Sequence, residues 1–316
     1  MTIETIPVTD EQAWLEQRLK DVTSTEVSAL FGLSPYLSEF ELFHQKRDQV
    51  VVRLEENERM KWGKRLESII AHGAAQDQGW DISKMDVYMR DVEARMGSSF
   101  DFQINSKSDG VGILEIKNVD GIQYARNWID DGQGNIEAPE HIELQVQHQM
   151  EVANVNWCAI VALVGGNTQK VVFRNRDRDV GHALRSKVAN FWDRVSLNKP
   201  PSPDYTMDAE FIIKQLRNHA DEGLAIEANP MLEDMIKQYN FVAKEAGDLL
   251  KIKEQKKAEI LEMIGTASKI VTSFGSMSTG MTKESQGTLV TPAMVGTYIG
   301  GRAGYRNFRF NPKKEK

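Results

Sequence analysis

The sequence predicts an α/β protein: a mixed β-sheet flanked by helices, followed by a C-terminal helical arm and a small β-like tail. Three observations predict it. Over residues 11–195 the patterns run as helices, three strands, a helix, two strands and a helix. A proline-rich stretch at residues 197–204 marks a boundary, and residues 229–264 carry apolar side chains at helical spacings of three and four. We therefore expect a domain over residues 1–200 and an extension over residues 201–316.

The composition is that of a folded protein. Of the 316 residues, 41% are hydrophobic and 27% are charged. The net charge of −7 argues against indiscriminate adhesion to nucleic acid, although it is compatible with local basic patches. The single cysteine, Cys158, excludes an internal disulfide framework and a cysteine-rich metal cluster. Because the sequence shows neither an apolar run of membrane-spanning length nor a signal-peptide pattern, it predicts a cytoplasmic protein without a membrane segment.

The first elements are expected to be helical. Residues 11–31 show helical spacing that is interrupted at Asp21 and Val22, after which Thr23 and Glu26 fit a capping box. Two further helices are expected over residues 41–47 and 58–80.

Strands and helices then alternate. Three strand-like runs lie at residues 84–91, 98–104 and 110–118. The polar, glycine-containing residues between the last two predict a hairpin. A helix over residues 139–154, strands over residues 157–166 and 170–175, and a helix over residues 181–195 follow. The first of these two strands is continuously apolar, which indicates a central position in the sheet.

Two charges stand inside the apolar third strand. Glu115 and Lys117 flank Ile116, and residues i and i+2 of a strand point to the same face. Burying a carboxylate and an ammonium costs free energy unless each has a partner. One interpretation is a cross-strand salt bridge at a sheet edge. The other is a divalent-metal site in which Asp101, from the preceding strand, faces Glu115, because Mg²⁺ and Mn²⁺ prefer such oxygen ligands.

In the metal-site interpretation, Ile116 could add its backbone carbonyl, and Lys117 could orient the attacking water or help to deprotonate it. A metal ion between the two carboxylates would offset their mutual repulsion. The register of the hairpin leaves one alternative open, since Asp109 could take the place of Asp101. The glycine-containing turn around Asp109 favours a solvated side chain there, so Asp101 is preferred.

Four blocks, in this order along the chain, resemble the YqaJ-type viral recombinase family, which is similar to lambda exonuclease and has the PD-(D/E)xK nuclease fold. The blocks are RLKDVTSTEVSALFGLSPY at 18–36, KWGKRLES at 61–68, the segment from SSFD to GILEIK at 98–117, and ELQVQHQM at 143–150. The resemblance implies a PD-(D/E)xK nuclease core over the first domain.

The resemblance also implies roles for individual residues. The metal would be held by Asp101, Glu115 and Glu67, Lys117 would be the catalytic lysine, and Gln145 would position a water or the substrate. Gly63 lies four residues before Glu67 on one helix face and leaves room beside it, although a solvated charge is the plain alternative for Glu67. Gln147 suits the role of Gln145 less well, because it points to another face of the helix. The sequence departs from the family at Phe100, where a proline is usual, and at Asn118 and Val119, where Cys-Pro often follows the lysine.

The first block suggests an anion site. A capped helix start would place Ser24 and Thr25 near free backbone N–H groups at a positive helix end. Arg18, a few residues upstream, could grip a phosphate with two hydrogen bonds. A plain capping box with a surface arginine is the alternative. The resemblance implies that Arg18 and Thr25 bind the 5′-phosphate of a DNA end.

The implied activity is a Mg²⁺-dependent alkaline exonuclease, with Mn²⁺ as a substitute and two ions in the site. It would digest the 5′ strand of linear double-stranded DNA and leave 3′ tails for a single-strand annealing protein of the same phage or prophage, in a bacterial cytoplasm. Similar enzymes form homo-oligomers, such as a ring-shaped trimer around DNA. Alternatives are an endonuclease or structure-specific nuclease on the same fold, a non-catalytic DNA-end-binding protein, and a scaffold centred on the C-terminal arm.

The extension carries two further predictions. Residues 229–264 predict an antiparallel helical arm or a coiled coil whose apolar seam is interrupted by Lys253 and Lys256. Such an arm would suit packing against the core, oligomer contacts or docking of the annealing protein. The basic, aromatic tail over residues 300–316 would either follow a DNA backbone or form a strand at residues 305–310 with a solvated basic end.

Overall fold

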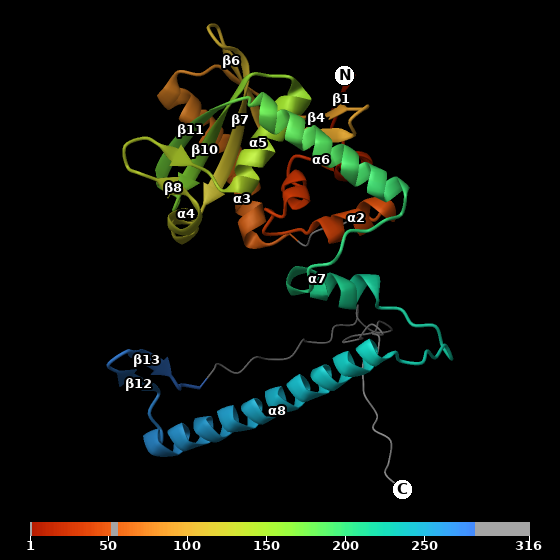
Figure 1. Cartoon of the computed structure of the whole chain (residues 1–316). Helices are drawn as coiled ribbons and strands as arrows, with labels where there is room; N and C mark the ends of the chain where they lie inside the picture. The colour runs from red at the N-terminus through yellow and green to blue at the C-terminus, as the bar shows by residue number, and fades with distance from the viewer. Residues whose placement is uncertain (1, 52–55, 282–316) are drawn as a thin grey trace, which may run out of the picture. The chain divides into compact units, whose positions relative to one another are not determined.

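The computed structural model describes residues 2–51 and 56–281, and the chain divides into two compact units, Met1–Ile212 and Ile213–Lys316 (Figure 1). The first unit confirms the predicted core, a mixed sheet flanked by helices. Within the described ranges, no helix is both long enough and apolar enough to cross a membrane.

The first unit is built around a five-stranded mixed sheet with the strand order β11-β10-β7-β6-β3. These strands are β3 (Ile82–Lys84), β6 (Phe102–Ser106), β7 (Gly110–Val119), β10 (Trp157–Val164) and β11 (Thr168–Asn175). Strands β6 and β7 form the predicted antiparallel hairpin, whereas β7 and β10 run parallel. Strand β10 lies between β7 and β11, which confirms the central position that its apolar run predicts.

A second sheet of four strands has the order β1-β4-β5-β2. Its members are β1 (Ile3–Pro7), β2 (Val22–Thr23), β4 (Val87–Asp91) and β5 (Met96–Ser99). Two predicted strands are wrong as single elements, because each is divided between the two sheets. Residues 84–91 hold the end of β3 and all of β4, and residues 98–104 hold the end of β5 and part of β6, with Phe100 and Asp101 at the break. The apolar alternation continues across this second break, so the sequence pattern does not reveal it.

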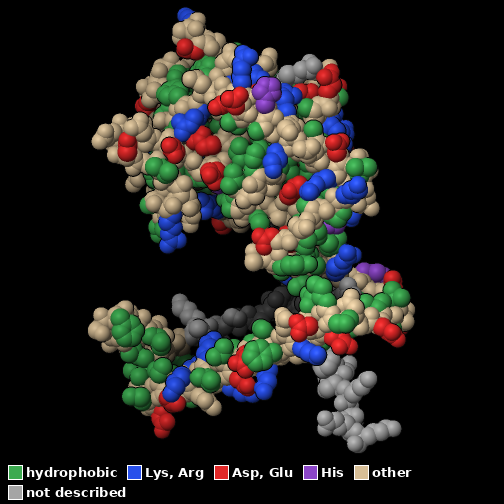
Figure 2. Space-filling model, in the orientation of Figure 1, with side chains coloured by type: hydrophobic (Ala, Val, Ile, Leu, Met, Phe, Trp, Pro, Cys, Tyr) green, Lys and Arg blue, Asp and Glu red, His purple; other side chains and the backbone are tan. Residues whose placement is uncertain are grey.

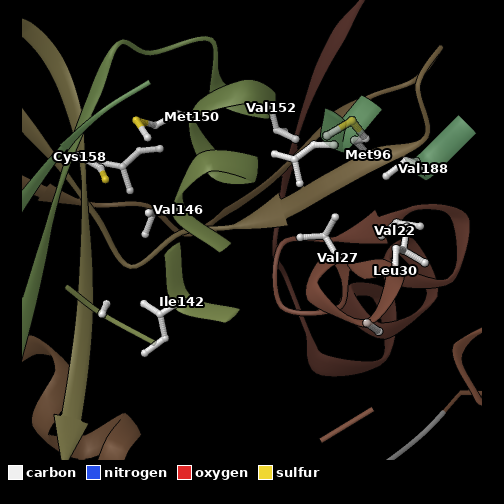
Figure 3. Close-up of a cluster of buried hydrophobic side chains, with 14 of the residues drawn as sticks. Val22, Val27, Leu30, Met96, Ile142, Val146, Met150, Val152, Cys158 and Val188 are labelled. Atoms are coloured by element: carbon white, nitrogen blue, oxygen red, sulfur yellow. The ribbon is translucent and has the colours of Figure 1, made fainter. Parts of the chain in front are cut away.

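Helices cover the two faces of the five-stranded sheet. Helix α5 (Glu140–Ala153) packs on one face, where Val146 and Met150 belong to the larger hydrophobic cluster (Figure 3). Helix α3 (Glu58–Gln78) packs on the other face through Ile70, Ala71 and Ala74.

The alternation along β7 follows these two layers. Ile113 and Val119 belong to the cluster on the α5 face, whereas Leu114 and Ile116 belong to the cluster on the α3 face. Since successive residues of a strand point to opposite faces, Glu115 shares the α5 face with Ile113 and Val119. The strand period therefore places a charge in the middle of an apolar face.

The segment before α2 (Glu39–Arg47) differs from the predicted restarted α-helix. Helix α1 (Glu11–Lys20) is followed by the short strand β2 and then by the five-residue 3₁₀-helix η1 (Val27–Phe31). Pairing of β2 with β5 holds this backbone extended. Only half of the expected capping box forms: the Glu26 carboxylate accepts a hydrogen bond from Thr23 N at 2.9 Å, while the Thr23 hydroxyl accepts one from Arg18 instead.

The remaining elements of the first unit are α4 (Gly121–Asn127), β8 (Ile129–Asp130), β9 (Ile136–Glu137), α6 (Arg178–Ser196) and α7 (Tyr205–Phe211). Helix α7 lies beyond the boundary that the sequence places at residue 200. Its Phe211 ring packs edge-on against Phe40 at 6.3 Å, and its buried Asp208 accepts a hydrogen bond from Ser38. These contacts with α2 explain why the first unit extends to Ile212.

The second unit contains one long helix, α8 (Pro230–Ile264), after the short element η2 (Ile212–Leu216). Asn229 caps α8, and Pro230 occupies its first turn. The described part of the arm is a single helix, and within it no side chain of α8 is buried. Figure 2 shows hydrophobic side chains exposed among charged ones along it. A hairpin of β12 (Lys269–Thr272) and β13 (Gly275–Ser278), which the sequence did not predict, follows. The predicted strand at residues 305–310 and the basic tail lie outside the described residues.

Candidate active site

Strand β7 continues beyond the end of its partner β6. The last paired residues are Phe102 and Leu114, so from Glu115 onward β7 has β10 on one side and no strand of the described chain on the other. A cavity of about 350 Å³ lies at this open edge. The residues that the sequence and the family resemblance assign to the site as preferred choices all line it: Arg18, Thr25, Glu67, Asp101, Glu115, Ile116, Lys117 and Gln145.

Asp101 stands at the break between β5 and β6, directly before the first paired residue of the hairpin. Its Oδ2 accepts a hydrogen bond from the backbone N–H of Ile116 at 2.8 Å, so this carboxylate caps the open edge of β7. Asp109, the alternative, lies in the hairpin turn, is exposed and is bonded by the hydroxyls of Ser106 and Ser108. The structure therefore places Asp101 in the cavity and Asp109 away from it.

Glu115 is 3% exposed, and its carboxylate accepts three hydrogen bonds. Lys117 Nζ and Gln145 Nε2 each donate to Oε1 at 2.6 Å, and Gln149 Nε2 donates to Oε2 at 2.8 Å. Lys117 Nζ also donates to Gln145 Oε1 at 3.0 Å. These charge-assisted bonds are the partners that a buried Glu-x-Lys pair requires.

The site holds more negative than positive charge. Burial raises the pKa of Asp101 well above its ordinary value, and the neighbouring charges of Glu115 and Glu67 raise it further. Burial likewise raises the pKa of Glu67. Burial by itself would lower the pKa of Lys117, but the attraction and hydrogen bond of Glu115 outweigh it and leave that pKa raised. One ammonium thus faces three carboxyl groups.

The donor chemistry fits a hard divalent cation, and Asp101, Glu115 and the Ile116 carbonyl are the oxygens at the open edge. Mg²⁺ is commonly held by one or two carboxylates, with water and substrate phosphate completing the coordination shell. Among the described residues, no group of three or more His, Cys, Asp and Glu side chains is gathered closely enough to hold a metal ion. The carboxylates therefore fit as a pair, with Glu67 lining the cavity as a further acid.

Arg18 and Thr25 meet beside the acidic group. Arg18 Nη2 donates to the hydroxyls of Thr23 and Thr25, at 3.2 Å each, and contacts Glu26 Oε1 at 3.4 Å. The expected helix-end anion site is wrong, because η1 is a short 3₁₀-helix and the N–H of Ser24 is bonded to Gly97 O. The Arg18 guanidinium and the Thr25 hydroxyl, which line the cavity, are therefore the groups that could bind an anion.

Three residues at the site were missed by sequence reasoning. Gln149 follows Gln145 by one helical turn and bonds the other oxygen of Glu115. Trp14 precedes Arg18 by one turn, lies 4.8 Å below its guanidinium and donates to Ser99 Oγ at 2.8 Å. In both cases the signal was an i, i+4 spacing. Lys46, only 2% exposed, donates to Arg18 O at 2.7 Å and pairs with Glu26 at 2.8 Å, and no local pattern indicates this.

Gln147 lies away from the site, as its position on the helix predicts. Its amide donates to the carbonyl of Asn175 at 2.9 Å and accepts from the N–H of Asp177 at 2.9 Å. Gln147 therefore anchors the loop between β11 and α6.

A hairpin that brings an aspartate, a Glu-x-Lys strand and a helix glutamine to one cavity is the core expected of the PD-(D/E)xK fold. Residues 13–156 match the model of a protein family that is described as the YqaJ-like viral recombinase domain. Over 243 residues the chain is 26% identical to the uncharacterized protein YqaJ of Bacillus subtilis (strain 168), covering 75% of this chain and 72% of that relative. This match over residues 13–156 confirms the resemblance of the four sequence blocks to the YqaJ-type family.

Two solved structures are also similar. An alkaline exonuclease from Laribacter hongkongensis has a TM-score of 0.47 and 19% identity, covering 60% of this chain and 94% of that chain. A phage-related exonuclease from Haemophilus somnus 129PT has a TM-score of 0.39 and 13% identity, covering 56% of this chain and 96% of that chain. The assignment of the site rests on the residues of this chain.

Proposed function

We propose that this protein is a divalent-metal-dependent deoxyribonuclease that digests the 5′ strand of linear duplex DNA in the 5′→3′ direction. The observation that carries the proposal is the meeting of two groups in one cavity. Asp101, Glu115 and Lys117 form a set suited to phosphodiester hydrolysis, and Arg18 with Thr25 forms a set suited to a terminal phosphate. The family description, viral recombinase, supports a role in DNA recombination.

The tasks of the catalytic side chains follow from their contacts. When bound by Asp101, Glu115 and the Ile116 carbonyl, Mg²⁺ or Mn²⁺ supplies Lewis-acid activation of the scissile phosphate and of a water. Lys117 Nζ faces the same cavity and would stabilise the charge that develops on the phosphate or hold the proton of the attacking water. Gln145 bonds both Glu115 and Lys117 and so fixes their relative positions. Glu67 would help to hold a second ion.

The 5′→3′ direction of digestion would be set by the neighbouring phosphate-binding pair, Arg18 and Thr25. Arg18 presents a planar set of donors that suits a doubly charged terminal phosphate. Its contact with Glu26, at 3.4 Å, is the longest of the three that Arg18 Nη2 makes, so a phosphate can replace it at small cost. Holding the 5′ end beside the acids would place the first phosphodiester bonds of that strand at the site. The enzyme would then release nucleotides from the 5′ end.

The proposal includes a protein partner and an oligomeric state. The remaining 3′ tail would be the substrate of a single-strand annealing protein, and a ring-shaped homotrimer around the duplex would keep the enzyme on its DNA. Light scattering of the full chain, alone and with a linear duplex, measures the number of copies. A ring requires at least three copies, and a monomer at all concentrations would remove it.

The test is digestion of a linear, 5′-phosphorylated, 3′-end-labelled duplex with Mg²⁺. Wild type is compared with Lys117→Ala and Glu115→Ala, and with Lys107→Ala as a matched exposed lysine of the hairpin turn. We expect release of nucleotides from the 5′ strand by wild type and Lys107→Ala, and none by the two site variants. Cleavage of covalently closed circles would favour an endonuclease. Binding without turnover in Mg²⁺ and in Mn²⁺ would leave a DNA-end-binding protein.

A further inference from the structure

A second cavity, of about 390 Å³, adjoins the active-site cavity. The two share four lining residues, Thr25, Lys117, Asn118 and Gln145. Lys117 therefore borders the acidic group on one side and this second cavity on the other.

The second cavity has the opposite chemistry to the first. None of the described residues that line the second cavity is acidic, whereas two of them, Arg59 and Lys117, are cationic. In a chain with a net charge of −7, a cavity with cationic and no acidic side chains is a local exception. Its volume is in the range of sites for small organic ligands. A ligand with negative charge suits it.

Aromatic rings and carboxamides make up much of the rest of the lining. The Tyr36 ring is 82% exposed and meets His141 edge-on at 5.8 Å, and Trp128, 7% exposed, stacks on Tyr124 at 5.2 Å. Asn118 and Asn127 add amide donors and acceptors. Rings for stacking, amides for base edges and cations for phosphate together suit a nucleotide.

Tyr36 is presented on a fixed turn. Ser34 Oγ accepts hydrogen bonds from the backbone N–H groups of Tyr36 and Leu37, at 3.2 Å each, and Pro35 restricts the backbone between them. A large apolar ring that is exposed on a held backbone loses little conformational entropy when it stacks on a ligand. This makes Tyr36 the face on which a base would rest.

We propose that this cavity is a nucleotide subsite, in which an unpaired base of the cleaved strand stacks on Tyr36 and its phosphate faces Arg59. The proposal rests on the proposed function and deepens it, since it has the enzyme take at least one nucleotide out of the duplex beside Lys117. Stacking against a protein ring requires a base that has left its pairing partner. A free mononucleotide product has the same chemistry and could occupy the same cavity.

The test measures binding without turnover. Fluorescence anisotropy follows a 3′-labelled, 5′-phosphorylated single-stranded oligothymidine in the presence of a chelator. In a series of such oligonucleotides, one base at a time is replaced by an abasic analogue. Wild type is compared with Tyr36→Ala, with Tyr36→Phe, which keeps the ring, and with Tyr205→Ala, a matched tyrosine that is 71% exposed on α7.

We expect Tyr36→Ala to weaken binding roughly tenfold, as the loss of one base–aromatic stack does. Tyr36→Phe and Tyr205→Ala should bind as wild type does. At one position, removal of the base should cost wild type the same factor and Tyr36→Ala nothing. Competition by thymidine 5′-monophosphate that is lost in Tyr36→Ala would assign the cavity to the product, whereas loss only with the oligonucleotide would assign it to the strand.

Equal binding by Tyr36→Ala and wild type, or a loss that is the same for intact and abasic oligonucleotides at every position, would overturn the subsite. Because Tyr36 is exposed, its truncation removes little packing, and equal thermal midpoints of the variant and wild type verify that both are folded. Failure of the proposed function is distinguishable. Base-dependent binding without Mg²⁺-dependent digestion would retain the subsite, and digestion without base-dependent binding would retain the nuclease alone.

Discussion

The molecule buries carboxylates in two regions along α5 and treats them in opposite ways. Glu151 accepts hydrogen bonds from Arg176 Nε at 2.6 Å and Arg185 Nε at 2.9 Å, and Arg185 also donates to Asp91 at 2.7 Å. Burial by itself would raise the pKa of Glu151, but these arginines outweigh it and lower that pKa. At the other region, burial and neighbouring acids raise the pKa of Asp101.

The difference separates a structural network from a candidate functional one. Around Glu151 each acid has an arginine, so the charges are balanced within the chain. Around Asp101 three acidic side chains line one cavity with two cations, Lys117 and Arg18, so the acids remain in excess and can hold a cationic ligand. Locally unfavourable arrangements are typical of functional sites. Matched substitutions in the two regions test whether they differ in this way.

The strongest test exchanges one carboxylate for its neutral amide in each region. Asp101→Asn should reduce nuclease activity at least about 100-fold, as loss of a transition-state-stabilising group does. It should also raise the free energy of unfolding of the metal-free protein by about 1 kcal/mol, because the repulsion of Asp101 by the neighbouring charges of Glu115 and Glu67 is removed. Glu151→Gln should leave activity within a few-fold and lower the free energy of unfolding by about 2–4 kcal/mol, since two partly exposed arginines lose their partner.

Digestion rates and urea unfolding measure both variants. If both lose stability and keep activity, or both lose activity alone, the two regions do not differ in the way described here.

The second prediction concerns Lys46, a buried side chain that holds the backbone of Arg18, a member of the phosphate-binding pair. Lys46→Met keeps the apolar stem but leaves Glu26 without its ammonium partner and Arg18 O without a donor. We expect the free energy of unfolding to fall by about 2–4 kcal/mol. The preference for 5′-phosphorylated over 5′-hydroxyl ends should also fall, because the Arg18 segment is less firmly held. Lys107→Met is the control, and an unchanged preference for phosphorylated ends would limit Lys46 to stability.

The third prediction is that the free energy of unfolding depends on pH through His148, a buried neutral side chain on α5. Burial lowers the pKa of His148 from 6.5 to about 4. As pH falls from 6.5 toward 4, the unfolded chain takes up a proton that the folded protein does not. The stability that depends on neutral His148 is lost over this window, about 3 kcal/mol in all.

Unfolding free energies at several pH values, for wild type and His148→Leu, measure this contribution. The difference between the two proteins should shift by the stated amount across the window, whereas exposed His182→Leu should track wild type. A constant difference between wild type and His148→Leu would show that His148 does not titrate as stated.

The smallest expected effects come from one glycine in each region. A Cβ at Gly181 would come within 2.4 Å of Glu151 Oε1, so Gly181→Ala should displace this carboxylate and lower stability by about 1–3 kcal/mol. A Cβ at Gly63 would meet no described atom within 4 Å. Gly63→Ala should therefore raise the stability of α3 by about 1 kcal/mol through helix propensity. Thermal unfolding measures both, and a rise in KM for DNA in Gly63→Ala alone would show that the substrate needs this space.

Local spacing determined a large part of the site. The period of two along β7 put Glu115 and Lys117 on one face, and the period of α5 brought Gln145 to that face and kept Gln147 from it. Such patterns depend only on the geometry of the element that carries them. They are reliable where the element forms as expected. The same helical spacing also predicts that Gln149, four residues after Gln145, lies on the Glu115 side of α5. The resemblance then supplied Glu67, Arg18 and Thr25, all of which line the same cavity.

What only the tertiary structure decided depends on segments that lie far apart in the chain. The alternation through residues 98–104 is that of one strand, yet the chain leaves one sheet and enters another at Asp101, because β5 and β6 pair with different partners. Pairing of β2 with β5 turned an expected helix end into extended backbone, and folding brought Lys46 under Arg18. A periodic pattern reports which face a residue takes. It carries no information on where a strand ends or what lies opposite, since those depend on which distant segments pack together.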